Sequence, residues 1–226
     1  KDASALENMR KVNALVIDKT GTLTIPNPNI DFTKADNIPF EEREQLKPNA
    51  AKAMARLKEE GIDVFMMSGD KEAAAHYWAE KAGIVHYKSE VRPDDKQKLV
   101  SQLQQEGKIV AMVGDGINDT QALATADVGI AISRGTDVAM DVAQVTLMGN
   151  DLMALPEAVN MSRRTVRMIW QNLFWAFIYN LVCIPLAAGA LYLFDINFQI
   201  TPMWASALMA FSSVSVVLNS LRLKWL

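Results

Sequence analysis

The sequence predicts an α/β protein, in which a parallel β-sheet carries helices on both faces and a two-helix transmembrane hairpin follows. Three observations lead to this prediction. The charged residues are distributed unevenly, short apolar runs alternate with amphipathic segments over roughly 150 residues, and two long uncharged stretches lie near the end of the chain. Alternating strands and helices favour a parallel sheet covered on both faces, whereas long uncharged stretches favour membrane spans.

The charge distribution divides the chain of 226 residues into two parts. Residues 168–226 contain three charged side chains, Asp195, Arg222 and Lys224, so the first 167 residues hold 21 of the 23 Lys and Arg and 25 of the 26 Asp and Glu. We therefore expect a soluble domain over 1–167 and a membrane hairpin over 168–226. The acidic soluble part argues against nucleic acid as a partner, and the single cysteine excludes an internal disulfide.

The soluble part reads as a regular succession of strands and helices. The apolar run 12–17 ends in Asp18, as expected of a buried parallel strand, and the segment 48–60 is a helix that Pro48 begins and Gly61 ends. In a parallel sheet the chemistry gathers beyond the carboxyl ends of the strands. The further predicted strands are 62–67, 85–88, 108–113, 128–132 and 145–148, and the further helices are 71–82 and 94–105, with one more after Gly116.

Two uncharged segments are long enough to cross a bilayer. They run over about 168–194 and 203–221, and about 20 apolar residues suffice for a span. Pro185 and Gly189 are tolerated in membrane helices. Arginines precede the first span and Arg222 follows the second, which places the soluble domain in the cytoplasm. The alternative is a hydrophobic core hairpin of a soluble protein.

Asp18 opens the segment Asp-Lys-Thr-Gly-Thr, directly after the first predicted strand. A carboxylate held there could attack a phosphoryl group and form an acyl phosphate. Gly21 would let the backbone turn close to the phosphate, and Thr22 could donate its hydroxyl. By itself, an aspartate at a strand end is more often a turn residue or a helix cap.

Three further elements favour phosphoryl chemistry. Ser68 supplies a second hydroxyl at the next strand end, and Lys96 supplies a positive charge for a phosphate or for Asp18. The loop 114–119 (Gly-Asp-Gly-Ile-Asn-Asp) brings two carboxylates and an amide together, which suits Mg²⁺. Each element has an ordinary structural explanation, but their combination at strand ends is hard to ascribe to chance.

These motifs resemble those of the P-type ATPases, which belong to the haloacid dehalogenase superfamily. Residues 18–24 resemble the phosphorylation signature, 68–70 (Ser-Gly-Asp) the Thr-Gly-Asp motif, 114–119 the hinge motif, and 135–139 a further family motif. The resemblance implies a haloacid dehalogenase-like (Rossmannoid) fold. It implies phosphorylation at Asp18, Mg²⁺ held by Asp18, the Thr20 carbonyl and Asp115, phosphoryl contacts from Thr22, Ser68, Gly69 and Lys96, and supporting roles for Asn118 and Asp119.

Thr20 distinguishes two branches of this superfamily. Its phosphatases place an acidic residue two positions after the nucleophile, where it shuttles protons. A threonine hydroxyl is a poor acid or base near neutral pH, so we expect a long-lived phosphoenzyme. Such an intermediate serves a pump, which favours the transporter over the phosphatase.

The hairpin contains the residues that indicate which ion is transported. Tyr179 and Asn180 lie in the first span, and Met209 and Ser213 in the second. A thioether suits Cu(I), although methionine also fills cores and Ser and Asn also join membrane helices. Copper(I)-exporting heavy-metal P-type ATPases resemble this chain in Tyr-Asn and Met-x-x-Ser-Ser, so the resemblance implies that these four residues handle copper(I) or a similar soft monovalent ion. Cys183 reads as a packed thiol.

The chain departs from the family pattern between Ile25 and about Leu46. There the family inserts a nucleotide-binding domain with a His-Pro pair, whereas neither His76 nor His86 precedes proline and residues 25–37 read as a short surface loop. Glu41–Glu44 read as a solvated helix start. We therefore expect the C-terminal part of an ATP-dependent copper pump in a cell membrane, incomplete without the remaining domains of the pump and surrounded by membrane lipid. The alternatives are a membrane-anchored phosphatase and a non-catalytic partner of a fuller pump.

Overall fold

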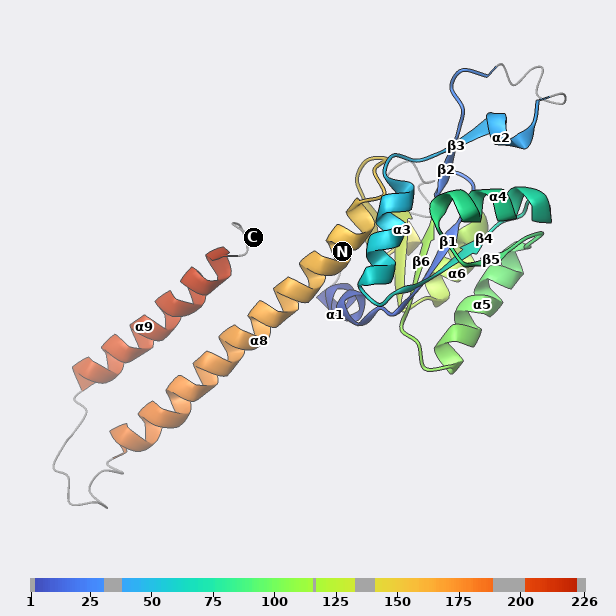
Figure 1. Cartoon of the computed structure of the whole chain (residues 1–226). Coiled ribbons are helices and arrows are strands. Elements are labelled where there is room, and N and C mark those ends of the chain that lie inside the picture. Colours follow the sequence, from blue (N-terminus) through green and yellow to red (C-terminus); the bar gives the residue numbers. More distant parts are fainter. Residues whose placement is uncertain (1–2, 31–37, 116, 133–140, 189–201, 223–226) are drawn as a thin grey trace. The chain divides into compact units, whose positions relative to one another are not determined.

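The computed structural model describes residues 3–30, 38–115, 117–132, 141–188 and 202–222 (Figure 1). It divides into two compact units, Lys1–Ser162 and Arg163–Leu226. The first unit contains a parallel sheet of six strands in the order β5-β4-β1-β6-β7-β8. The strands are β1 (Ala14–Asp18), β4 (Asp63–Met67), β5 (His86–Lys88), β6 (Val110–Gly114), β7 (Val128–Ile132) and β8 (Val145–Leu147).

Helices cover both faces of this sheet because alternate residues of each strand point to opposite faces. From β1, Leu15 and Ile17 belong to one hydrophobic core and Ala14 and Val16 to the other. The first core includes side chains of α1, α3, α4 and the start of α8, and the second includes side chains of α5 and α6. The helices are α1 (Ala3–Lys11), α3 (Ala50–Glu59), α4 (Glu72–Ala82), α5 (Pro93–Gln105), η2 (Ile117–Asp119), α6 (Thr120–Thr125) and α8 (Ala154–Ala187).

The predicted fold class is confirmed: a parallel sheet is surrounded by helices, and a long apolar helix follows. The crossovers place β1 between β4 and β6, so the chain segments after these three strands lie side by side. This order brings the ends of the first, second and fourth predicted strands to one edge of the sheet.

The segment after Asp18 differs from the prediction. Residues 25–37 were expected to form a loop, but β2 (Thr24–Pro26) pairs antiparallel with β3 (Glu44–Leu46). The β-branched Thr24 and Ile25 suit a strand, and Pro26 ends it. Between them lies the short helix α2 (Phe40–Arg43). Glu44 therefore belongs to a strand and not to the solvated helix start that was expected.

The second unit contains the remainder of α8 and the helix α9 (Pro202–Leu221). The helix α8 begins well before the predicted span, while α9 matches the second span closely. Among the described helices, one is long and apolar enough to cross a membrane, over Ala154–Leu186, and a shorter apolar stretch covers Ser206–Leu221. Large apolar side chains on both helices are exposed, as lipid-facing residues would be: Trp170, Phe177, Leu181, Met209, Phe211 and others.

Candidate active site

Asp18, Lys96 and Asp119 meet in a buried cluster at the carboxyl end of β1. The Lys96 Nζ donates to Asp18 Oδ1 at 2.5 Å and to Asp119 Oδ1 at 2.6 Å. The exposed fractions are 7% for Asp18, 7% for Lys96 and 2% for Asp119. Charge-assisted hydrogen bonds of this length are strong, and burial removes competing water. The predicted nucleophile and the predicted lysine are therefore in direct contact.

Asp115 lies over the turn that follows Asp18. A Cβ added to Gly21 would lie 1.8 Å from Asp115 Oδ2, so only a glycine leaves room for this carboxylate. Gly21 also has a positive φ of 74°, which glycine adopts most readily. Similarly, a Cβ on Gly114 would lie 2.5 Å from Asp119 Oδ2. Gly21 thus allows the two loops to approach each other, and Gly114 allows the loop 114–119 to fold back on itself.

The three carboxylates could hold a metal ion. Asp18, Asp115 and Asp119 each offer one ligand atom, and these atoms lie within 4.8 Å of one another. Hard oxygen ligands at this spacing fit Mg²⁺. Lys96 donates hydrogen bonds to two of the three carboxylates, so their negative charges outnumber its single positive charge. The sequence prediction gave Asp119 a supporting role, whereas the geometry groups it with Asp18 and Asp115. Thr20, whose carbonyl was the third predicted ligand, follows β1 directly and forms a bridge with Thr24.

Crowding of carboxylates changes their proton affinity. Burial, with a further contribution from the negative charge of Asp119, raises the pKa of Asp18 to about 7, although Lys96 opposes the change. Burial and Asp119 also raise the pKa of Asp115. Burial favours a lower pKa for Lys96, but the charges of Asp18 and Asp119 outweigh it and raise that pKa. Lys96 therefore stays protonated beside the two carboxylates.

Two predicted hydroxyl groups lie buried at this edge of the sheet. Thr22 is fully buried, and its Oγ1 has no hydrogen-bond partner among the described residues. Such an orphaned donor is uncommon, and a ligand oxygen such as a phosphate oxygen would satisfy it. Ser68 is 1% exposed, and its Oγ accepts a hydrogen bond from the Asp70 backbone N–H at 3.1 Å. Gly69 is exposed next to it.

Asn118 is exposed and lies in η2, next to Asp119. Its supporting role stays a prediction, which is based on its position in this loop. Gly116 and the motif 135–139 lie outside the described residues. The carboxylates, Lys96 and the Thr22 hydroxyl can together bind a phosphoryl group next to a nucleophile, with hard oxygens available for a cation.

Sequence reasoning missed two further buried lysines, Lys19 and Lys47. Lys19 is 2% exposed and forms ion pairs with Asp70, at 2.6 Å, and with Glu44 of β3. Glu44 was assigned to a solvated helix, and Lys19 was treated only as part of a motif. The apolar surroundings of position 19 could not be seen, because they come from segments distant in the sequence. A lysine between two carboxylates links the segment after β1 to β3 and to the start of α4.

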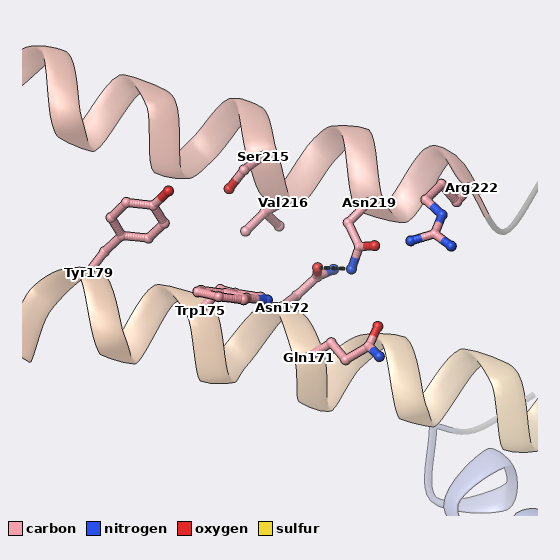
Figure 2. A pocket seen from close by; sticks show the side chains of 8 residues that line it. All are labelled: Gln171, Asn172, Trp175, Tyr179, Ser215, Val216, Asn219 and Arg222. Carbon is pink, nitrogen blue, oxygen red and sulfur yellow. Dashed lines mark hydrogen bonds between the residues drawn. The ribbon is translucent and has the colours of Figure 1, made fainter.

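Of the four residues predicted to handle copper, Tyr179 lines a groove between the two helices. Figure 2 shows a groove between α8 and α9, with a volume of about 440 Å³, in which Tyr179 lies at one end. Asn180 and Ser213 are exposed, Met209 is 69% exposed, and none of the three lines this groove. The Ser213 hydroxyl donates to the Met209 carbonyl at 3.2 Å. Cys183 is half-buried, His76 and His86 are exposed, and none of these three belongs to a metal cluster found among the described residues.

Comparison with known proteins finds similar chains. A family model described as haloacid dehalogenase-like hydrolase matches residues 30–127. The chain is 53% identical over 180 residues to the probable copper-transporting ATPase PacS of Synechocystis, covering 79% of this chain and 24% of that protein. It is 34% identical to a copper-exporting P-type ATPase of Legionella pneumophila, over 99% of this chain and 44% of that protein. Over most of its length the chain is therefore similar to copper-transporting P-type ATPases.

A solved structure supports the same fold for this chain. A zinc-transporting PIB-type ATPase in its E2·Pi state superposes with a TM-score of 0.80, at 23% identity, covering 99% of this chain and 51% of that one. The chain corresponds to the haloacid dehalogenase-like phosphorylation region of such pumps. It spans about a quarter of the length of the first curated relatives that it matches.

The alignment with the Legionella protein is longer than this chain. That alignment extends over 325 positions, whereas this chain has 226 residues. The Legionella pump therefore carries on the order of a hundred residues without a counterpart here, a size typical of a small domain.

Proposed function

We propose that this chain provides the phosphorylation site and the last two membrane helices of a P-type ATPase that exports copper(I) or a similar soft metal ion. In this proposal an aspartyl phosphate at Asp18 couples ATP hydrolysis to transport, and the remaining domains and helices of the pump supply the nucleotide site and the rest of the ion path. The soluble unit would lie in the cytoplasm and the hairpin in the cell membrane.

The contact of Lys96 with both Asp18 and Asp119 is the observation that carries this proposal. The ammonium group is positioned to hold Asp18 in place and to neutralise the oxygens of an incoming phosphoryl group. The buried hydroxyl groups of Thr22 and Ser68 would both donate hydrogen bonds to those oxygens. Asp18, Asp115 and Asp119, with the Thr20 carbonyl, would hold Mg²⁺, which when bound neutralises negative charge on the transferred group.

The first experiment asks whether Asp18 is phosphorylated. The purified chain is incubated in detergent with Mg²⁺ and ³²P-labelled acetyl phosphate, and a label that hydroxylamine removes is measured. We expect labelling of the wild type and of Asp94→Asn, an exposed carboxylate on the same helix as Lys96. We expect none with Asp18→Asn, and equal labelling of Asp18→Asn and wild type would refute the assignment.

The assay also separates the pump from a phosphatase. Because Thr20 is a poor acid or base, the labelled protein should lose phosphate slowly after the donor is removed. Rapid turnover of a generic phosphate ester, with no label retained, would favour the membrane-anchored phosphatase instead.

The cargo is tested by Cu(I) binding. The chain in lipid nanodiscs is titrated with Cu(I) against a chromogenic chelator, and Met209→Ala is compared with Met203→Ala, an exposed methionine at the start of the same helix. Weaker binding in Met209→Ala alone supports a copper role for position 209. Equal binding in both variants and the wild type would contradict it.

A further inference from the structure

The groove between α8 and α9 lies within the unit Arg163–Leu226, so both of its walls belong to one compact unit (Figure 2). Its volume of about 440 Å³ is typical of small-molecule sites. The lining residues follow one another at steps of three or four, as Gln171, Trp175 and Tyr179 do on α8. Residues at this spacing share one face of a helix, so a single stripe of each helix lines the groove.

The two ends of the groove differ in charge. Arg222, which directly follows α9, lies at the end opposite to Tyr179 and is the one charged residue among the described residues of the lining (Figure 2). Gln171 stands just after the start of the first predicted span at 168, and Arg222 just after the end of the second at 221. Both residues are therefore expected where the helices meet the membrane surface, which the distribution of arginines places on the cytoplasmic side.

Three hydrogen-bond donors of the lining have no partner among the described residues. The Gln171 amide, the Trp175 indole and the Arg222 guanidinium form no hydrogen bond or ion pair with any of them. Asn172 and Asn219, by contrast, are bonded to each other at 2.7 Å. An indole N–H and a guanidinium donate hydrogen bonds and accept none. Donors left unpaired beside hydrocarbon are costly, so the groove favours a ligand rich in acceptor oxygens.

A phospholipid carries acceptor oxygens at the depth at which these donors are expected. Its phosphate suits an arginine, and its ester carbonyls accept hydrogen bonds from neutral donors. The groove also offers apolar surface, because the Trp175 ring and Val216 line it. Basic sites between membrane helices on the cytoplasmic side bind anionic headgroups. An anionic lipid leaves its net charge for Arg222, whereas a zwitterionic lipid carries its own cation beside the phosphate.

We propose that this groove binds the headgroup of an anionic phospholipid of the cytoplasmic leaflet. The lipid phosphate pairs with Arg222, and the ester oxygens accept hydrogen bonds from Gln171 and Trp175. The acyl chains leave the groove along exposed apolar side chains of the two helices, such as Phe177 and Leu218. The proposal goes beyond the proposed function and rests on one part of it, the placement of the hairpin in a membrane. It involves neither the phosphorylation site nor the transported ion.

The experiment measures lipid binding to the whole chain in detergent micelles by native mass spectrometry. Phosphatidylglycerol and phosphatidylcholine with the same acyl chains are titrated in turn, and the fraction of chains with bound lipid gives each dissociation constant. We expect one molecule of phosphatidylglycerol to bind about five-fold more tightly than phosphatidylcholine, which is the effect of one basic residue at a membrane surface. In Arg222→Gln the two lipids should bind equally. Arg167→Gln is the matched control and should keep the preference, because Arg167 is an exposed arginine just before the first predicted span and does not line the groove.

A second pair of variants tests whether the lipid occupies the groove itself. Val216→Phe adds a ring inside the groove, whereas Val217→Phe adds the same ring at the next position, which is exposed and does not line it. We expect Val216→Phe to weaken the binding of phosphatidylglycerol about ten-fold, because the ring takes up space that the headgroup needs. Val217→Phe should bind this lipid as the wild type does, and equal binding by the two variants overturns the assignment to the groove.

Three other results contradict the proposal. Loss of the preference in Arg167→Gln as well as in Arg222→Gln would show only a general attraction of anionic lipid to cationic surface. Displacement of the lipid by glycerol 3-phosphate would assign the site to free phosphate. A dimer mass that disappears in Val216→Phe would assign the groove to a helix of a second copy of this chain.

A flotation assay with phosphatidylcholine vesicles keeps this proposal apart from the proposed function. A chain that does not float with the vesicles contradicts the membrane placement in the proposed function. A chain that floats but binds both lipids equally overturns the lipid site alone and leaves the proposed function intact.

Discussion

In the unit Lys1–Ser162, side chains from three distant segments meet at hydrogen-bond distance, since Lys96 bonds both Asp18 and Asp119. In the unit Arg163–Leu226, three of the four predicted copper residues are exposed, and of the four only Tyr179 lines the groove between α8 and α9. The difference reflects how each unit buries its residues. A parallel sheet covered on both faces brings its strand ends together within one domain, whereas two helices leave most of their surface open. The phosphorylation site can therefore form within one unit, while two helices supply only part of the surroundings of a cargo site.

The strongest test of this comparison is Lys96→Met. The change leaves three carboxylates close together without the ammonium group that bonds two of them, so we expect phosphorylation of Asp18 to slow about 100- to 1000-fold. The measurement is the initial rate of labelling by acetyl phosphate. Lys98→Met, an exposed lysine of the same helix, serves as the control and should label normally. A rate in Lys96→Met close to that of the control would show that the soluble unit does not assemble the site as described.

Gly21→Ala tests the packing of the two loops. The new Cβ would displace Asp115, and a shift of this size should reduce labelling about 100-fold. Gly61→Ala is the matched control, because Gly61 has a similar φ of 78° but nothing within 4 Å of its added Cβ. The control should lose about 1–2 kcal/mol of stability through backbone strain alone, with labelling retained. Similar labelling of both variants would mean that Asp115 is not held over the turn.

The hairpin has its own measurable contact. Asn219 donates to Asn172 at 2.7 Å (Figure 2), and Asn172 donates to Ser220 at 2.9 Å. A double-mutant cycle of Asn172→Ala and Asn219→Ala, followed by reversible unfolding in mixed micelles, should give a coupling of about 0.6 kcal/mol. A coupling of zero would indicate that the two helices are not joined here.

The smallest expected effect lies at the sheet edge. Glu72 of α4 accepts hydrogen bonds from Ser89 at 2.5 Å and Tyr87 at 2.7 Å, and these bonds hold the pKa of Glu72 below its ordinary value of 4.5. A lowered carboxyl pKa stabilises the fold above pH 4.5, and this stabilisation is lost as the pH falls through the folded-state value. Thermal unfolding should therefore separate wild type from Glu72→Gln at neutral pH and bring them together in acid. Glu80→Gln, exposed on the same helix, should follow the wild type throughout.

Much of the soluble unit could be predicted because its signals are local. The run 12–17 is almost entirely apolar, as buried parallel strands are, and it shares residues 14–17 with β1. Asp18 and Lys96 could be paired because each belongs to a specific motif. The pairing of β2 with β3 was missed, since three-residue strands give almost no periodic pattern.

The contact between Lys19 and Glu44 was missed for a different reason. Each residue looks solvent-exposed in its own segment, and Glu44 follows two other acidic residues in a charged run. Only the antiparallel pairing of β2 with β3 brings Glu44 back to the end of β1, where it forms an ion pair with the buried Lys19. The grouping of Asp119 with the possible metal ligands likewise depends on the 3₁₀ turn at 117–119.

The sequence by itself determined the fold class, the strands of the parallel sheet and most of its helices, the apolar character of the last 59 residues, and the motifs that carry the chemistry. These features depend on periodicity and on residues close together in the chain. The tertiary structure alone decided which carboxylates accept hydrogen bonds from Lys96 and where the cavity lined by Lys19 lies. It also decided that the Thr22 hydroxyl has no partner among the described residues. Such contacts join residues tens of positions apart, and they follow from the placement of β1 between β4 and β6, which no local pattern encodes.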